Sequence, residues 1–144
     1  MSGPGGARDP GAAHRRERAQ APVLIGVGLD TVDVGRFRAV LARRPGMIER
    51  MFSASEREAM SARLDPVPGY AARFAAKEAT MKALHSGLGA FDLADVEIVR
   101  SPGGAPVLVA SGRAAALAAS LGVSRLDVSL THTSTLASAV VVAS

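Results

Sequence analysis

The segment from Tyr70 to Gly89, YAARFAAKEATMKALHSGLG, constrains the fold more than any other stretch of the chain. Its alanines recur with a period near 3.6 residues, which predicts a single helix with an almost entirely methyl face. Because alanine lets another backbone approach closely, we expect that face to be buried. Gly87 and Gly89 are expected to stop the helix. The alanines of this face are Ala71, Ala72, Ala75, Ala76, Ala79 and Ala83.

Charged side chains follow the same helix on its other sides. Phe74, Glu78 and Lys82 are spaced at i+4 along a second face, and Arg73 and Lys77 form a parallel pair beside them. The simplest interpretation is a solvated helix with an i,i+4 ion pair between glutamate and lysine. The alternative is a functional site, and the segments around the helix favour it.

Composition limits the class of protein. The chain has 144 residues, of which 48% are hydrophobic and only 3% aromatic, so we expect one globular domain with an aliphatic core. The absence of cysteine excludes disulfides, thiolate nucleophiles and cysteine-ligated zinc. No apolar run is long enough to span a membrane and no signal peptide is recognised, so a cytoplasmic location without a membrane partner is expected.

The first 22 residues differ from the rest. They are rich in Gly, Pro, Ala and Arg and lack hydrophobic periodicity, which predicts a disordered basic tail over residues 1–22 and a folded domain over residues 23–144. The net charge is +4. A small basic module that binds nucleic acid is therefore one functional alternative, although the few aromatic residues offer little surface for base stacking. The solvated tail is favoured, and we expect no nucleic-acid partner.

The first element of the domain is predicted to be a buried strand over Val23 to Leu29. Gly26 and Gly28 remove side chains from it, which indicates that another element packs closely there. The strand is expected to end at Asp30, where an apolar element meets the start of a helix. Asp30 is either a turn or capping residue or a ligand for a hard cation.

A helix is predicted from Val32 to Arg44, with Val34, Phe37 and Leu41 facing the core. Its neighbouring face carries two guanidinium groups on either side of an apolar side chain. This face is either a solvated basic surface or a docking surface for an acidic helix. The residues of that face are Arg36, Val40 and Arg43.

The remaining segments predict short helices and strands in alternation. They give an α+β fold in which a small antiparallel sheet packs against the long alanine-faced helix. The expected elements are a helical turn over Met47–Phe52, a helix capped by Ser53 with Glu56, a loop over Asp65–Gly69, strands over Asp95–Arg100 and Pro106–Ala110 joined by a turn at Ser101–Ala105, a helix over Gly112–Leu121 capped by Ser111 and closed by Gly122, and strands over Leu126–Leu130 and Leu136–Ala143.

His132 stands at the end of an apolar strand, in the polar stretch Thr131–Thr135. It is either a hydrogen-bonded structural residue or a phosphate ligand. Two acids on separate elements, a lysine one turn beyond one of them and a histidine together predict a magnesium and phosphate site, because Mg²⁺ takes few carboxylates and completes its shell with water and phosphate oxygens. There is no P-loop or Rossmann glycine pattern, so an ordinary nucleotide hydrolase lacks support.

Three ordered segments resemble those of holo-acyl-carrier-protein synthases: GVGLDTVDVGRF, RFAAKEATMKALHSGLG and VSLTHTSTLASAVVV. The resemblance covers Val23 to the C-terminus and excludes the tail. It implies a Mg²⁺-dependent enzyme that moves 4′-phosphopantetheine from coenzyme A to a serine of apo acyl carrier protein and releases adenosine 3′,5′-bisphosphate. It also implies the 4′-phosphopantetheinyl transferase fold and a homotrimer with active sites between neighbouring subunits.

The same resemblance implies roles for individual residues. Asp30 and Glu78 would bind Mg²⁺, and Lys82 would touch the pyrophosphate. Glu78, directly or through a water, is the expected acceptor of the serine proton. The predicted catalytic residues are therefore Glu78, Lys82 and His132, the predicted coenzyme A contacts are Arg73, Lys82, Pro106, His132 and Thr133, and the predicted docking face for the carrier protein is Arg36, Val40 and Arg43.

Two positions depart from the family pattern. The turn before Pro106 usually carries a basic residue where this chain has Ala105, which weakens a phosphate contact from that turn. Many relatives carry an acid soon after the histidine, whereas Thr133, Ser134 and Thr135 supply none, so a third carboxylate ligand is not expected. A broad-specificity transferase serving polyketide or peptide carriers is the nearer alternative function.

Overall fold

The computed structural model describes residues 1–2 and 21–144, so the predicted disordered tail lies almost wholly outside the described residues. The fold is α+β, as expected. Its elements are β1 (Gly26–Asp33), α1 (Val34–Arg43), α2 (Met47–Met51), α3 (Ala54–Ser61), α4 (Val67–Ala83), the 3₁₀ turn η1 (Leu93–Asp95), β2 (Val96–Arg100), β3 (Pro106–Ala110), α5 (Gly112–Ser120), β4 (Leu126–His132) and β5 (Leu136–Ala143).

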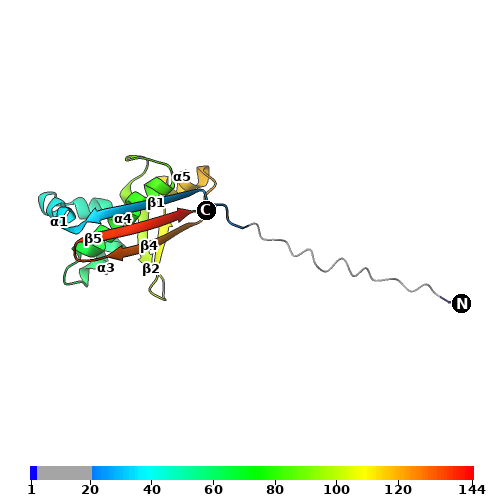
Figure 1. The fold of residues 1–144 in the computed structure, drawn as a ribbon, viewed down its shortest axis with the longest axis horizontal. Coiled ribbons are helices and arrows are strands. Elements are labelled where there is room, and N and C mark those ends of the chain that lie inside the picture. The colour runs from blue at the N-terminus through cyan, green and yellow to red at the C-terminus, as the bar shows by residue number, and fades with distance from the viewer. Residues whose placement is uncertain (3–20) are drawn as a thin grey trace.

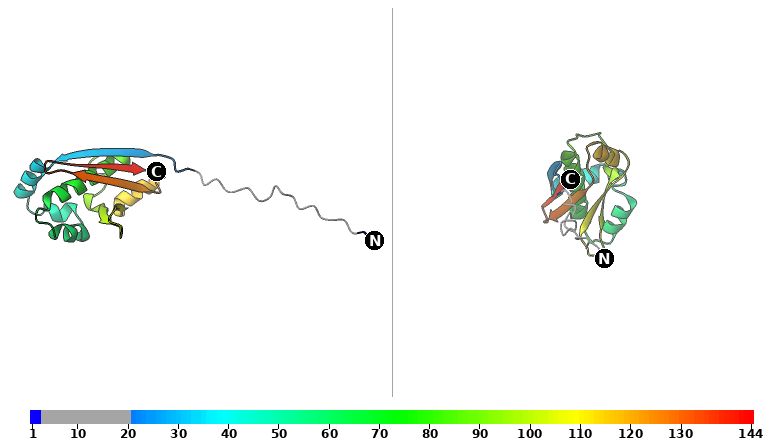
Figure 2. Two further views of the ribbon diagram at one scale, coloured as in Figure 1. Left: turned by 60° about the horizontal axis from the view of Figure 1, so that its bottom comes forward. Right: turned by 90° about the vertical axis from the view of Figure 1, so that its right-hand side faces the viewer.

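Two antiparallel sheets surround the long helix. Strands β1, β5 and β4 form a three-stranded sheet in that order, and β2 pairs with β3 in a separate hairpin. Helix α4 lies behind the three-stranded sheet in Figure 1, and α1 lies at one end of the sheet. Figure 2 shows that, within residues 21–144, no helix covers the opposite face of this sheet.

The alanine face of α4 is buried as predicted, and two glycines explain how closely it packs. A Cβ atom on Gly28 would lie 1.7 Å from the carbonyl oxygen of Ala79, and one on Gly26 would lie 1.9 Å from that of Ala83. Because real Cβ atoms do not approach oxygen so closely, only glycine fits at either position. The expected close packing against this strand is confirmed, and α4 is the element that causes it.

The boundary between β1 and α1 differs from the prediction. Strand β1 continues through Asp30 to Asp33, pairing with β5 along its length. Thr31 and Val32 favour a strand, and the helix cap is Asp33, whose Oδ1 accepts a hydrogen bond of 2.8 Å from the Arg36 backbone N–H. Asp30 therefore lies within the strand and caps nothing. Val34 and Phe37 are buried as expected.

Helix α4 also begins and ends earlier than predicted. It starts at Val67 because a proline is tolerated in the first turn of a helix, so the predicted loop is shorter. It ends at Ala83, before either glycine. The residue with positive φ after the helix is His85, at 53°, and the Ser86 N–H donates to the Met81 carbonyl oxygen to close the last turn.

The capping box of α3 is confirmed, since Ser53 and Glu56 each cap the other. Ser111 stands at the predicted start of α5 but does not cap it with its side chain. That role falls to Asp95, whose carboxylate accepts from the Arg113 N–H at 3.2 Å. The predicted hairpin β2–β3 forms with the expected turn, and β4 extends two residues further than predicted, to His132.

A buried ion pair that the sequence did not indicate joins elements from the middle of the chain. The Lys77 Nζ lies 2.9 Å from the Glu56 Oε2, and both side chains are fully buried. Lys77 also donates to the carbonyl oxygens of Leu93 and Val96, while Glu56 accepts from the Ile98 N–H. One contact set therefore ties α3, α4, η1 and β2 together.

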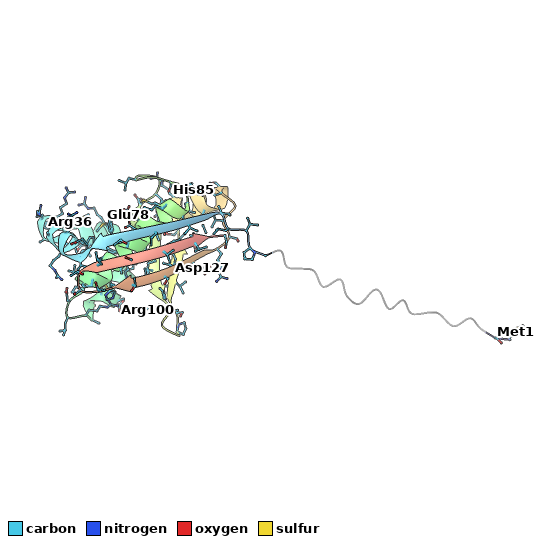
Figure 3. The ribbon with its side chains drawn as sticks, viewed as in Figure 1. Met1, Arg36, Glu78, His85, Arg100 and Asp127 are labelled. Carbon is cyan, nitrogen blue, oxygen red and sulfur yellow. The ribbon has the colours of Figure 1, made fainter. Side chains whose placement is uncertain are left out.

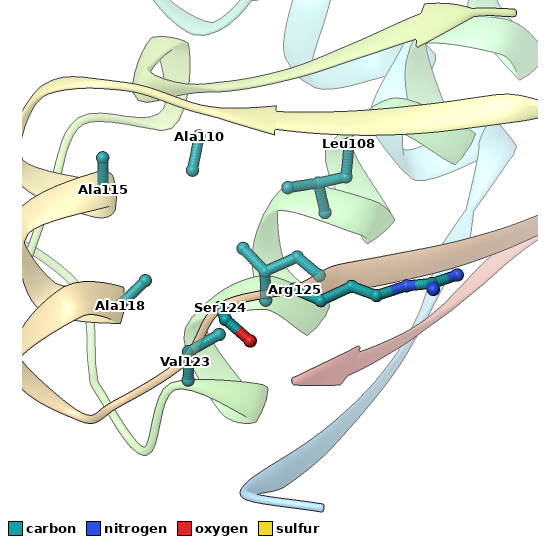
Figure 4. Close-up of a pocket in the computed structure, with 8 residues that line it drawn as sticks. Leu108, Ala110, Ala115, Ala118, Val123, Ser124 and Arg125 are labelled. Atoms are coloured by element: carbon teal, nitrogen blue, oxygen red, sulfur yellow. The ribbon is translucent and has the colours of Figure 1, made fainter. Parts of the chain in front are cut away.

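A pocket of about 250 Å³ lies between α5, β3 and the start of β4 (Figure 4). Leu108, Ala110 and Ala118 contribute to an apolar lining, and the Arg125 side chain extends away from it to pair with Asp127. None of the predicted site residues lines this pocket. Among the described residues, no helix is long and apolar enough to cross a membrane.

Candidate active site

Helix α4 divides the predicted site residues between its two sides. Glu78 and Lys82 lie on the side of β1 and α1, whereas Arg73 lies on the side of the β2–β3 hairpin. Figure 3 shows the separation: Glu78 and Arg36 lie beyond β1, and Arg100 lies beyond β4, on the opposite side of the three strands. One chain therefore presents two partial sites.

The first partial site is a groove of about 670 Å³ between β1, α1 and α4. Asp30 and Glu78 line it, as do Arg36 and Val40 of the predicted docking face. Phe74 contributes to its apolar part and stacks on Phe37, with ring centroids 5.3 Å apart. The structure thus brings both predicted metal ligands and two of the three docking residues to one groove, while Arg43 is exposed on α1 and does not line it.

The charges in this groove are unequally solvated. Burial raises the pKa of the Glu78 carboxyl, and the negative charge of Asp30 raises it further, while Lys82 opposes the shift. Lys82 does not pair with Glu78, its i,i+4 neighbour. Its Nζ lies 3.1 Å from the Asp30 Oδ1 and donates to the Leu29 carbonyl oxygen at 2.8 Å. Two carboxylates therefore line the groove, and the Lys82 ammonium contacts one of them.

This arrangement fits a divalent cation. Because the charge of Asp30 raises the pKa of Glu78, a cation that neutralises both carboxylates is favoured between them. Among the described residues, no group of three or more His, Cys, Asp or Glu side chains gathers into a metal cluster, so Asp30 and Glu78 would act as a pair. Mg²⁺ suits such a pair, because it takes few carboxylates and retains water or phosphate ligands. Mg²⁺ binding here remains a prediction.

The raised pKa of Glu78 predicts a stability difference in metal-free protein. Its proton is held more tightly in the folded state than in the unfolded chain, so stability falls as the pH rises from the ordinary glutamate pKa through the raised one. Glu78→Gln removes this effect. In urea denaturation with chelator, we expect the variant to be more stable than wild type at pH 7.5 and to lose that advantage at pH 4. A wild type that is equally or more stable at pH 7.5 would contradict the electrostatic account.

The second partial site surrounds Arg73 on the other side of α4. Arg73 and Pro106, both predicted coenzyme A contacts, line a small pocket together with Arg100. Arg73 is 3% exposed, and its Nε is buried without a hydrogen-bond partner among the described residues. Burial lowers the pKa of its guanidinium, and the positive charges of Arg63 and Arg100 lower it further. An anion would satisfy all of these groups.

His132 and Thr133 lie at the end of β4 on this side of the sheet. In the sheet register His132 aligns with Ala137 of β5, which in turn aligns with Val32 of β1, so His132 stands on the edge strand opposite to that of Asp30. The His132 side chain is exposed. The Thr133 hydroxyl accepts from the Leu136 N–H at 3.1 Å and thereby fixes the β4–β5 turn. The structure does not bring His132 to the carboxylates within one chain.

Sequence reasoning missed Arg100 and Arg63. Arg100 ends β2 opposite Pro106, and its Nη1 donates to the Gly104 carbonyl oxygen at 2.7 Å. Its guanidinium is thus held on the turn that lacks a basic residue at Ala105. The hairpin register was a usable signal, because the last residue of β2 had to face the first of β3. Arg63 gave no such signal: its guanidinium lies against Gly69 of α4, close enough for its charge to act on Arg73.

Comparison with known proteins agrees with this geometry. A family model described as the 4′-phosphopantetheinyl transferase superfamily matches residues 26–140. The chain belongs to this superfamily. A holo-[acyl-carrier-protein] synthase from Frankia casuarinae is 48% identical over 121 residues, which cover 83% of this chain and 97% of that protein. The chain is thus an enzyme, a phosphopantetheinyl transferase.

Solved structures give the same fold. A holo-[acyl-carrier-protein] synthase from Neisseria meningitidis superimposes with a TM-score of 0.78 at 27% identity, covering 85% of this chain and 99% of that one. The enzyme from Helicobacter pylori, solved in complex with coenzyme A, gives 0.70 at 30% identity, covering 82% and 99%. The predicted fold class is confirmed.

Proposed function

We propose that this enzyme transfers 4′-phosphopantetheine from coenzyme A to a serine of an apo acyl carrier protein, with Mg²⁺ as cofactor and adenosine 3′,5′-bisphosphate as the second product. The observation that carries the proposal is the groove lined by Asp30, Glu78 and Arg36 of α1, with the Lys82 ammonium paired to Asp30. The names of the relatives and the coenzyme A complex of the Helicobacter pylori enzyme support the two substrates.

The bonds that form and break in this reaction belong to the two substrates, so the protein takes little part in the covalent chemistry. The serine oxygen bonds to the phosphorus that carries pantetheine, the bond from that phosphorus to the bridging oxygen breaks, and adenosine 3′,5′-bisphosphate leaves with the electron pair. A bound Mg²⁺ would supply Lewis-acid neutralisation of the pyrophosphate charge. Asp30 and Glu78 would hold it at the end of the groove.

The chain's own residues account for the other requirements. The Glu78 carboxylate, half-buried in the groove, accepts the serine proton. The Lys82 ammonium, half exposed beside Asp30, offsets the charge that develops on the leaving phosphate. Arg73 and Arg100 offer cations to another phosphate of coenzyme A from the second partial site.

The decisive experiment is incubation with coenzyme A, Mg²⁺ and a fatty-acid-type apo carrier protein, followed by intact mass measurement. A mass increase equal to one phosphopantetheine on the carrier protein is expected. The same assay with polyketide and peptide carriers separates a dedicated enzyme from a broad-specificity one. Failure to modify any carrier would refute the proposed function.

We also propose that the enzyme is a trimer with active sites shared between subunits. Two observations support it. The partial sites on opposite sides of α4 do not meet within one chain, so a neighbour is needed to bring His132 and Arg73 to Asp30 and Glu78. The uncovered face of the three-stranded sheet also carries exposed apolar side chains, including Val27, Leu29 and Leu136 at 52%, 61% and 48% exposure.

A charge placed on that sheet face should separate the subunits. Val140 lies on it at the centre of β5, paired with Leu29, and Val140→Arg would introduce a guanidinium at the proposed interface. We expect light scattering to report a trimer for wild type and a monomer for the variant, with native circular dichroism and at least about a hundredfold loss of transfer, since no site would be complete. A strict monomer with full activity would contradict shared sites.

The α1 face should determine how the carrier protein docks. Acyl carrier proteins present an acidic helix beside the modified serine, and Arg36 and Arg43 flank the half-buried Val40 on this face. Exposed charges mainly accelerate encounter and are screened by salt. We expect Arg36→Glu or Arg43→Glu to raise the KM for the carrier protein about tenfold or more, to change the KM for coenzyme A little, and to remove most of the salt dependence of kcat/KM. Unchanged carrier kinetics in both variants would exclude this face.

A further inference from the structure

The Asp30 carboxylate already has a cation beside it in the structure. The Lys82 Nζ lies 3.1 Å from the Asp30 Oδ1 and 2.8 Å from the Leu29 carbonyl oxygen, so it is held at the very group predicted to bind the metal. Asp30 is only 19% exposed at its side chain, whereas Lys82 is 54% exposed. The carboxylate is fixed in the strand, and the lysine reaches it from a flexible stem that solvent surrounds.

We propose that Lys82 is the resident counter-ion of Asp30 in the metal-free enzyme and that a divalent cation displaces it. An ammonium and Mg²⁺ both require the oxygens of this carboxylate and repel each other at such short range. Binding of the metal therefore breaks the ion pair and releases Lys82 from β1. The released ammonium is then free for a phosphate of coenzyme A, so that metal binding prepares the phosphate site.

The contacts favour exchange over a permanent pair. A lysine that is half in solvent loses little when it leaves, because exposed ion pairs contribute little to stability. The other lysine of the chain shows the contrast. Lys77 is completely buried, with Glu56 and two backbone carbonyls as partners, and cannot leave without stranding a buried carboxylate that has no counter-ion. Helix α4 thus carries one lysine that is held in place, Lys77, and one that can move, Lys82.

If the metal displaces Lys82, removing this lysine should raise the affinity for a divalent cation, whereas altering a binding site usually lowers it. Lys82→Met removes the competing ammonium while keeping a stem of similar length. We expect it to bind Mn²⁺, used as the probe without coenzyme A, about fivefold more tightly than wild type in isothermal titration, which is the order of an exposed ion pair. Arg38→Met is the matched control, because it also removes one cation from an exposed ion pair, with Asp65, and should leave the Mn²⁺ affinity unchanged.

The movement of the side chain can be observed directly, because Lys77 and Lys82 are the only lysines in the sequence. Protein labelled with ¹³C-lysine gives two Cε signals in NMR spectra. Saturating Mg²⁺ should shift the Lys82 signal and leave the Lys77 signal in place. In Asp30→Asn, the Lys82 signal should already stand near its Mg²⁺-bound position and should not respond to Mg²⁺.

The outcomes separate this inference from the proposed function on which it rests. Mn²⁺ affinity that is unchanged or weaker in Lys82→Met, with wild type binding normally, would overturn the exchange and leave the metal site intact. A Lys82 signal that stays fixed at Mg²⁺ saturation would overturn it as well. Wild type that binds neither Mn²⁺ nor Mg²⁺ would remove the metal site itself, and the exchange with it.

Discussion

Asp30→Ala and Glu78→Ala are each expected to lower transfer of phosphopantetheine at least about a hundredfold, because each removes one of the two carboxylates proposed to hold Mg²⁺ in the groove. Neither change should unfold the protein. Without Asp30, Lys82 remains largely in solvent. Without Glu78, a half-buried carboxyl whose pKa is already raised is gone, which relieves repulsion.

The measurement is the initial rate of carrier-protein modification at saturating coenzyme A, together with circular dichroism and thermal unfolding of each variant. Glu58→Ala is a matched control, since it removes an exposed carboxylate from α3 and should retain the wild-type rate. Adding a chelator to wild type should reproduce the loss, and restoring Mg²⁺ should reverse it. Full activity of either variant, or a wild-type rate that is insensitive to chelator, would contradict the metal site.

The parts of the fold that the sequence predicted well depend on local patterns. The alanine face of α4 is a period of small residues, and Gly26 and Gly28 directly report that another element packs closely. The capping box of Ser53 and Glu56 likewise depends on residues within one four-residue segment. Such features need no knowledge of the distant chain, because neighbouring positions already determine them.

The boundaries of the helices and strands were harder to predict, because they depend on pairing with distant parts of the chain. The extension of β1 through Thr31 and Val32 follows from pairing with Ser138 and Ala137, more than 100 residues later. Asp33 and not Asp30 became the cap for that reason, and the consequence for function is direct. Asp30 lies in the strand, with Lys82 beside it, instead of in a flexible turn.

The sequence predicted which residues form the site, but it did not predict that α4 divides them between its two sides. Periodicity placed Arg73 and Glu78 on different faces of one helix, yet it could not say which element each would meet. Packing of α4 on the sheet puts Glu78 beside β1 and Arg73 beside the hairpin. The resemblance to a trimeric family had implied shared sites, and this division supplies a physical reason for proposing them.

The largest effect on stability is expected at Lys77, which sequence reasoning placed beside Arg73 on α4 without assigning it a role. Its ammonium is fully buried, lies 2.9 Å from the Glu56 carboxylate and stands 5.3 Å from the centre of the Phe52 ring. Burial lowers the pKa of Lys77, and the charge of Glu56 opposes the shift. Glu56 is buried as well, with hydrogen bonds from the Ser53 and Ile98 N–H groups at 3.0 Å.

Lys77→Met would leave the Glu56 carboxylate buried without its counter-ion and would orphan the carbonyl oxygens of Leu93 and Val96. We expect a loss of about 3–5 kcal/mol in the free energy of unfolding, measured by urea denaturation at pH 7. Lys82→Met, from the exposed side of the same helix, should change it by less than about 0.5 kcal/mol. The double variant Lys77→Met with Glu56→Gln removes both charges, so its loss should be clearly smaller than the sum of the single losses. Additive losses, or a loss below about 1 kcal/mol in Lys77→Met, would mean that this pair does not hold α4 against α3 and β2.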